Sequence, residues 1–260
     1  MRFIDTHTHL FDEAFHKDLP EVIKRAQQAG MIRALLPCIN LPTWQDMMEV
    51  CKDYPLLCQP MLGIHPTEIG PFYHQDLQKM HAMLTENTTG YVAIGEVGLD
   101  FYWDRSQYKT QIDVFETQVK WAIEFNLPLM IHCRKAQAEM VAVLKKYRKE
   151  QLRGVFHCFS GSYEMACQLL ELGDFMLGIG GVVTYHNTKL PQTLAKLPIS
   201  KIVLETDSPY MTPVPHKGER NEPSYIPYII QTLTDVYGLT ENEIGEETIK
   251  NTVRMFHLTI

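Results

Sequence analysis

The sequence has 260 residues, of which 45% are hydrophobic and 21% charged, and its formal net charge is −7 at pH 7. This composition is typical of a globular protein with a sizeable core and excludes a disordered chain. The acidic balance argues against a protein that wraps long duplex DNA, because phosphate binding usually leaves a basic face. It still allows an enzyme that meets a few phosphates in one cleft, where bound divalent cations supply local positive charge.

The cysteine content and the hydropathy of the sequence indicate where in the cell the protein is expected to lie. The six cysteines include no CxxC pair and are too few for a disulfide framework in a chain of this length. No stretch approaches the roughly 20 apolar residues that a membrane span needs, and polar residues interrupt the N-terminal segment where a signal peptide would be apolar. We therefore expect reduced thiols, no membrane contact, no obligate protein partner and a cytoplasmic location.

Short apolar runs alternate with longer segments of helical periodicity, the pattern of βαβ units around a parallel sheet. Strands are expected at 2–7, 32–36, 58–63, 91–95, 128–132, 154–157, 175–179 and 201–205. Helices are expected at 17–29, 42–53, 74–86, 107–125, 135–149, 163–172, 187–196, 224–237 and 241–256. Eight strands with interposed helices predict an α/β fold of the TIM (β/α)8 barrel type, which typically takes about 250 residues. We expect residues 1–260 to form this single domain, with an extra C-terminal helix.

The segment from Ser208 to Pro223 is too long for a simple turn between strand and helix, and it is rich in proline. Loops of this length in a compact domain are usually functional. A solvated connector is the alternative interpretation.

Polar side chains fall where the expected strands end, which is the face that carries TIM-barrel active sites. His7 and His9 end the first strand, and alternation places them on one side, about 6.5 to 7 Å apart. An isolated pair of this kind is as typical of capping as of metal binding. The same feature recurs at the ends of four further strands, at Glu96, His132, His157 and Asp207. Five such ends in one barrel favour convergence on metal over a set of unrelated core residues.

Imidazole and carboxylate groups suit zinc, manganese or iron, and harder oxygen ligands also accommodate magnesium. Six ligands exceed the needs of one tetrahedral ion, so we expect two divalent ions (Mg, Mn or Zn) bridged by Glu96. The ligands are expected to be His7, His9 and Asp207 around one ion, and His132 and His157 around the other. Ions about 3.5 to 4 Å apart clamp the attacking and leaving oxygens of a phosphodiester, and a water activated by both would attack. Asp207, which could take the proton of that water, and Glu96 are therefore the expected catalytic residues.

Three further residues are expected to bind substrate: His65, Arg134 and Arg220. His65 could donate to a phosphate oxygen, or simply precede Pro66 in a turn. Either arginine could hold a phosphate through two hydrogen bonds, or cap a helix, or pair with a loop carboxylate. Together with Lys135 and Lys217, these arginines would make the mouth of the site basic.

Glu205 and the aromatic residues at 101–103 are further candidates for the site. Glu205 lies one alternation step deeper than Asp207, where it could orient a ligand histidine. Phe101, Tyr102 and Trp103 are three successive aromatic residues at the expected mouth, where they could stack the bases of a single strand. A hydrophobic plug against a neighbouring loop is the alternative.

The motifs together resemble those of the TatD-like DNases, which are related to the amidohydrolase superfamily. They are HTH at 7–9, GIHP at 63–66, GEVGLD at 95–100, IHCR at 131–134, HCFSG at 157–161, ETDSPY at 205–210 and RNEP at 220–223. The resemblance extends from about residue 2 to residue 256. It implies a TIM barrel, a divalent-metal hydrolase, and metal ligands at the same six positions.

We therefore expect a metal-dependent deoxyribonuclease, acting on DNA ends or single strands. The alternative within enzymes is a hydrolase of a small ester, lactone or amide, because the same constellation serves acyl chemistry. A non-catalytic metal-binding or scaffolding protein is the alternative from another class.

Overall fold

The computed structural model describes residues 1–103 and 105–259, and its strands form two parallel sheets. The strands are β1 (Phe3–Asp5), β2 (Met31–Pro37), β3 (Cys58–Met61), β4 (Ile94–Asp100), β5 (Leu129–Arg134), β6 (Arg153–Phe156), β7 (Asp174–Ile179) and β8 (Ile202–Leu204). The first sheet has the order β1-β2-β3 and the second the order β4-β5-β6-β7-β8.

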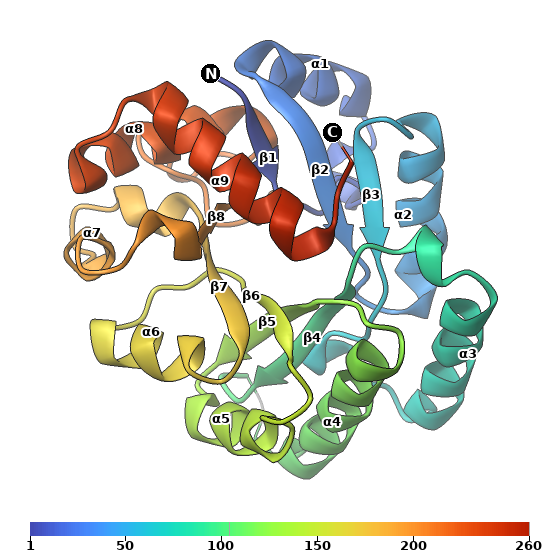
Figure 1. The fold of residues 1–260 in the computed structure, drawn as a ribbon. Coiled ribbons are helices and arrows are strands. Elements are labelled where there is room, and N and C mark those ends of the chain that lie inside the picture. The colour runs from blue at the N-terminus through green and yellow to red at the C-terminus, as the bar shows by residue number, and fades with distance from the viewer. Residues whose placement is uncertain (104, 260) are drawn as a thin grey trace.

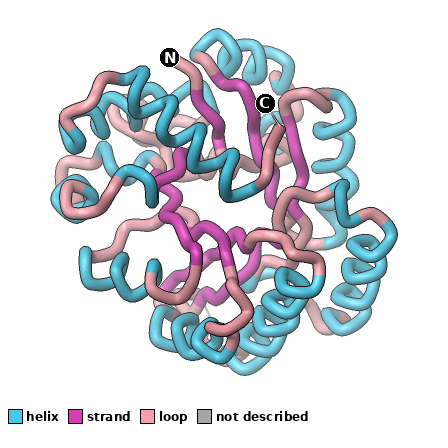
Figure 2. The backbone as a smooth tube through the Cα atoms, viewed as in Figure 1, coloured by secondary structure: helices cyan, strands magenta, loops and turns pink. Residues whose placement is uncertain are grey.

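Backbone hydrogen bonds join the two sheets at both seams. Leu62, just past β3, pairs with Ile94 of β4, and Thr8, past β1, pairs with Ser208, past β8. The amide of Thr6 also donates to the Leu204 carbonyl at 2.9 Å. The strands therefore close into a barrel, which confirms the expected TIM-like fold (Figure 2).

Helices surround the strands on all sides (Figure 1). They are α1 (Leu19–Ala29), α2 (Leu41–Asp53), α3 (Tyr73–Glu86), α4 (Tyr108–Glu124), α5 (Gln137–Lys146), α6 (Tyr163–Leu170), α7 (Leu190–Leu194), α8 (Ile226–Tyr237) and α9 (Glu241–Phe256). None of the helices in the described part of the chain is long and apolar enough to cross a membrane.

Most expected boundaries differ from the structure by one to three residues, and two elements differ enough to need an explanation. The fourth strand was expected at 91–95 but runs from Ile94 to Asp100, because the glycines of this segment let it continue against β5. The helix expected at 187–196 is only Leu190–Leu194, because a turn closed by Thr188 precedes it and Pro191 fits only its first turn. The first difference matters for function, since Glu96 lies inside β4 rather than at its end.

The amino-terminal half of the barrel interior is filled by an apolar layer, and each strand region contributes one residue to it. These are Ile4, Leu35, Met61, Ala93, Met130, Val155, Met176 and Val203. Helix α9 closes the amino-terminal end of the barrel with Ile249, Met255 and Phe256, which pack into the same cluster. In Figure 1, α9 crosses in front of the strands, and it contacts β1 and β8. The opposite, carboxyl-terminal end stays open for polar residues.

The six cysteines are free. Burial raises the pKa of Cys38 and of Cys51 to about 12, and the pKa of Cys133 is raised to about 12 for the same reason. These thiols therefore stay protonated at neutral pH and are poor nucleophiles.

Met255→Ala should lower the free energy of unfolding by about 2 to 5 kcal/mol, because it empties a fully buried position between α9 and the barrel interior. Urea unfolding followed by circular dichroism measures the change. The exposed Glu246→Ala in the same helix is the control and should change little. Equal stability of the two variants would show that α9 does not seal the barrel.

Candidate metal centre

The ends of β1 and β8 are tied together by a buried hydrogen-bond network. Asp5 accepts hydrogen bonds from the Thr206 hydroxyl at 2.6 Å and from the Thr206 amide at 3.0 Å. The hydroxyls of Thr8 and Ser208 lie 2.7 Å apart. Burial raises the pKa of Asp5 to about 7. This network fixes the two short segments that carry His7, His9 and Asp207.

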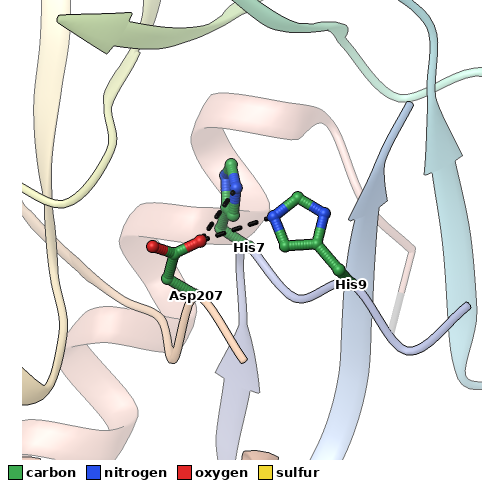
Figure 3. Close-up of side chains that lie close together, drawn as sticks. All are labelled: His7, His9 and Asp207. Atoms are coloured by element: carbon green, nitrogen blue, oxygen red, sulfur yellow. Dashed lines mark ion pairs between the residues drawn. The ribbon is translucent and has the colours of Figure 1, made fainter. Parts of the chain in front are cut away.

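Figure 3 shows His7, His9 and Asp207 pointing toward one another. The Asp207 Oδ1 atom lies 3.6 Å from His7 Nε2 and 3.4 Å from His9 Nε2. The backbone of Asp207 has a φ of 57°, in the left-handed region, which aspartate tolerates better than most residues. The three residues thus form one group of potential metal ligands at the β1–β8 seam.

Glu96 stands at the middle of the site, and its two oxygens face different histidines. Its Oε2 atom lies 3.1 Å from His7 Nε2 and 3.8 Å from His9 Nε2. Its Oε1 atom lies 3.0 Å from His132 Nδ1 and 2.8 Å from His157 Nε2. One buried carboxylate therefore separates two histidine pairs, as a ligand bridging two ions would.

A glycine in β4 makes this arrangement possible. Gly98 has a φ of 148°, and a Cβ atom there would collide with the carbonyl oxygen of His132 on β5. Only glycine lets β4 pass so close to β5. The consequence is that Glu96 on one strand and His132 on the next approach to hydrogen-bonding distance.

The electrostatics of the site are set by this buried carboxylate. Burial acts to raise the pKa of Glu96, but the facing charges of His157 and His65 outweigh burial and hold it well below its usual range. Burial acts to lower the pKa of His157, yet attraction to Glu96 raises it well above its ordinary value. For His7 the effect of burial is larger than the attraction to Glu96, so burial lowers the pKa of this histidine. The carboxylate thus attracts positive charge, which a proton or a metal ion can supply.

The donor set fits divalent cations. Several buried imidazole nitrogens have no hydrogen-bond partner among residues 1–103 and 105–259, namely His7 Nδ1, His7 Nε2, His9 Nδ1 and His157 Nδ1. Unsatisfied buried polar atoms are rare and need an explanation such as an ion. Nitrogen and carboxylate ligands of this kind suit zinc or manganese. His132 Nδ1 and His157 Nε2 lie 3.1 Å apart, so both rings aim a nitrogen at one point.

Two further carboxylates support the histidines from outside. Asp100 Oδ2 accepts a hydrogen bond from His132 Nε2 at 3.0 Å, which leaves the Nδ1 lone pair to face Glu96. Glu205 lies deeper and accepts the amide of Cys158, with its Oε1 atom 3.7 Å from His157 Nδ1. The position of Glu205 beneath a ligand histidine was expected from strand alternation, but no role was predicted for Asp100. The four-residue spacing of Glu96 and Asp100 on one strand was the available signal.

A pocket of about 230 Å³ opens onto this cluster. It is lined by His9, Ile39, His65, Thr67, Glu68, Glu96, His132, His157, Asp207 and Tyr210. His65 Nδ1 accepts the amide of Thr67, so its Nε2 atom carries the proton and faces Glu96 Oε1 at 3.3 Å. Sequence reasoning did not single out Thr67 or Tyr210, which share this wall.

The two arginines expected to bind substrate lie at different places. Arg134 is the last residue of β5 and is not among the residues that line the pocket; its guanidinium lies 3.7 Å from the centre of the Tyr102 ring. Arg220 instead makes two hydrogen bonds of 2.7 Å to the carboxylate of Asp18. It lies outside the residues that line the pocket. Arg220 can reach a phosphate only by leaving this carboxylate.

A closed parallel barrel whose open end gathers histidines and carboxylates defines a metal-dependent hydrolase. The family model of TatD related DNases matches residues 4–257. The chain belongs to this family. It is 36% identical over 255 residues to the uncharacterized metal-dependent hydrolase YabD of Bacillus subtilis, covering 98% of each chain.

Two other comparisons agree with the family assignment. A protein of Pectobacterium carotovorum named 3'-5' ssDNA/RNA exonuclease TatD is 31% identical over 260 residues, covering 98% of this chain and 99% of that one. The crystal structure of YjjV, a TatD homolog from Escherichia coli, superposes with a TM-score of 0.92 at 28% identity and covers 99% of both chains. The resemblance seen in the motifs is confirmed.

Asp100→Asn should weaken zinc binding by about 10- to 100-fold, because the amide no longer fixes which nitrogen of His132 carries the proton. Titration of the chelated protein with zinc against a chromophoric competitor measures this affinity. The exposed Asp113→Asn on α4 is the control and should bind zinc as the native protein does. Unchanged affinity in Asp100→Asn would show that Asp100 does not position His132.

Proposed function

We propose that this protein is a two-metal phosphodiesterase that cleaves DNA, from an end or in single-stranded form. The observation that carries the proposal is the division of the Glu96 carboxylate, with His7 and His9 on one oxygen and His132 and His157 on the other. Asp207 completes the first set. Two divalent ions held in this way would polarise a phosphodiester and supply an activated water at neutral pH.

Two residues of the pocket, Asp207 and His65, have proposed roles in accepting a proton and in donating a hydrogen bond. Asp207, with its side chain partly open to the pocket, accepts the proton of the attacking water. Burial acts to raise its pKa, but the hydrogen bond from His9 and the facing charge of His157 outweigh burial and lower it, so the carboxylate is ionised at neutral pH. His65 presents an N–H group toward the same space and donates to a phosphate oxygen.

The choice of phosphodiester over a small ester, lactone or amide draws on two lines of support. Arg134, the last residue of β5, places a positive charge near Asp100 and outside the pocket walls, where a second phosphate of a polynucleotide would lie. A relative at 31% identity carries the name of a 3'-5' exonuclease for single-stranded DNA and RNA. Neither argument applies to a neutral lactone, which remains the alternative substrate.

Glu96→Gln should remove both metal ions and abolish hydrolysis, since no other described carboxylate contacts both histidine pairs. Metal content by mass spectrometry and turnover on single-stranded DNA, duplex DNA, RNA and a model lactone are the measurements. Native protein should lose turnover on prolonged chelation and regain it when manganese or zinc is added.

The exposed Glu86→Gln is the matched control and should retain metal and activity. Two ions and normal turnover in Glu96→Gln would contradict the bridging role. Turnover of the lactone alone by the native enzyme would replace the phosphodiesterase assignment with the acyl one.

We propose that Arg220 leaves the carboxylate of Asp18 and binds a substrate phosphate in its place. Arg220→Ala should then raise KM on single-stranded DNA roughly tenfold with little change in kcat, because a charged hydrogen bond present in both ground and transition states is lost. Asp18→Asn loosens the ion pair and should leave KM unchanged or lower. If both variants instead raise KM alike, Arg220 only holds the loop that carries Asp18.

A further inference from the structure

A second, smaller pocket adjoins the metal centre. Its volume is about 130 Å³, and Thr67 belongs to the walls of both pockets. The other lining residues are Pro66, Ile69, Asp100, Trp103, Gln107 and Gln111. The two pockets are therefore neighbours, with Thr67 between them.

Two of the polar groups of this pocket are already engaged. The Asp100 carboxylate bonds His132 and the amide of Tyr102, and the Gln111 amide bonds both backbone groups of Asp100. Asp100 and Gln111 still line the pocket, together with Thr67 and Gln107, so its walls are mixed. The apolar part of the walls belongs to Pro66, Ile69 and Trp103.

Trp103 is 72% exposed, although its ring is among the largest apolar surfaces in the chain. Tyr102 meets it edge to face at 4.9 Å, and the Arg134 guanidinium lies 5.4 Å from its ring. An exposed aromatic ring beside a cationic group is the arrangement on which proteins stack the bases of single-stranded nucleic acid.

We propose that this pocket, here called the Trp103 pocket, receives one base of a single-stranded substrate, next to the phosphodiester at the metal centre. The inference rests on the proposed phosphodiesterase function and names the part of the substrate that this function leaves open. A base in a duplex is paired and stacked on its neighbours, so it can enter only after it is unpaired. The pocket thus selects single strands or frayed ends, and it does so without reading sequence, because every base has a stacking face.

The test compares an ordinary single-stranded oligonucleotide with one of the same length built from abasic residues, which keeps the backbone and its charge. Trp103→Ala should raise KM for the ordinary strand roughly tenfold, the effect of losing one stacked base. KM for the abasic strand should not change, nor should kcat for either. Trp103→Phe should restore most of the loss, and Leu56→Ala, an equally exposed apolar residue preceding β3, is the control.

Binding gives a second readout that does not need turnover. An oligonucleotide with non-hydrolysable methylenephosphonate linkages, which keep the backbone charge, should quench tryptophan fluorescence, and Trp103→Phe should abolish the quenching, because Trp121 is only 4% exposed and Trp44 is partly buried. If the native enzyme cleaves DNA but Trp103→Ala leaves the ratio of the two KM values unchanged, the Trp103 pocket is refuted while the phosphodiesterase stands. If nothing is cleaved but Trp103 is quenched, the pocket is supported and the phosphodiesterase assignment fails.

Discussion

Much of this structure depends on one buried carboxylate. Glu96 lies within 4 Å of five imidazole rings in the barrel mouth, and it has little contact with solvent. An isolated buried carboxylate would take up a proton, since transfer of a charge from water costs many kcal/mol. Here the surrounding histidines hold its pKa well below the usual range. The folded barrel therefore maintains a negative charge at its centre that can be matched only by cations.

The division of the barrel into two layers allows this charge to exist. Below the site, one apolar side chain from each strand region fills the interior, and α9 closes the amino-terminal end. Two residues further along three of the strands, Met130, Val155 and Val203 are followed by His132, His157 and Glu205. Alternation points each of these pairs to the same side. The apolar layer excludes water from beneath the site, which strengthens the interactions above it.

The parts of the site that sequence could predict are those that follow from strand periodicity. A polar residue at the end of an apolar run lies on the open face of a barrel, and this alone placed His132, His157 and Asp207 near His7 and His9. Asp100 was missed because β4 was expected to stop at residue 95, and its continuation depends on how closely Gly98 lets it approach β5. The Arg220–Asp18 pair joins residues 202 apart in sequence, and no local pattern signals such a partner. Contacts of that kind follow from the closed fold alone.

The net charge of −7 and the polyanionic substrate proposed above can be reconciled at the same place. Glu68, Glu96 and Asp207 line the pocket, Asp100 lies next to it, and Glu205 is buried beneath, while Arg134 acts on Asp100 from outside the pocket. Without metal ions, this surface would repel a phosphodiester. Two divalent cations would bring four positive charges to the cluster and reverse the sign of the local field. Binding of metal and binding of substrate would then be linked, because the ions would also create the site for the phosphate. In the proposed function, a net charge of −7 would limit adhesion to long nucleic acids, so that the enzyme would bind only the few nucleotides nearest the metal centre.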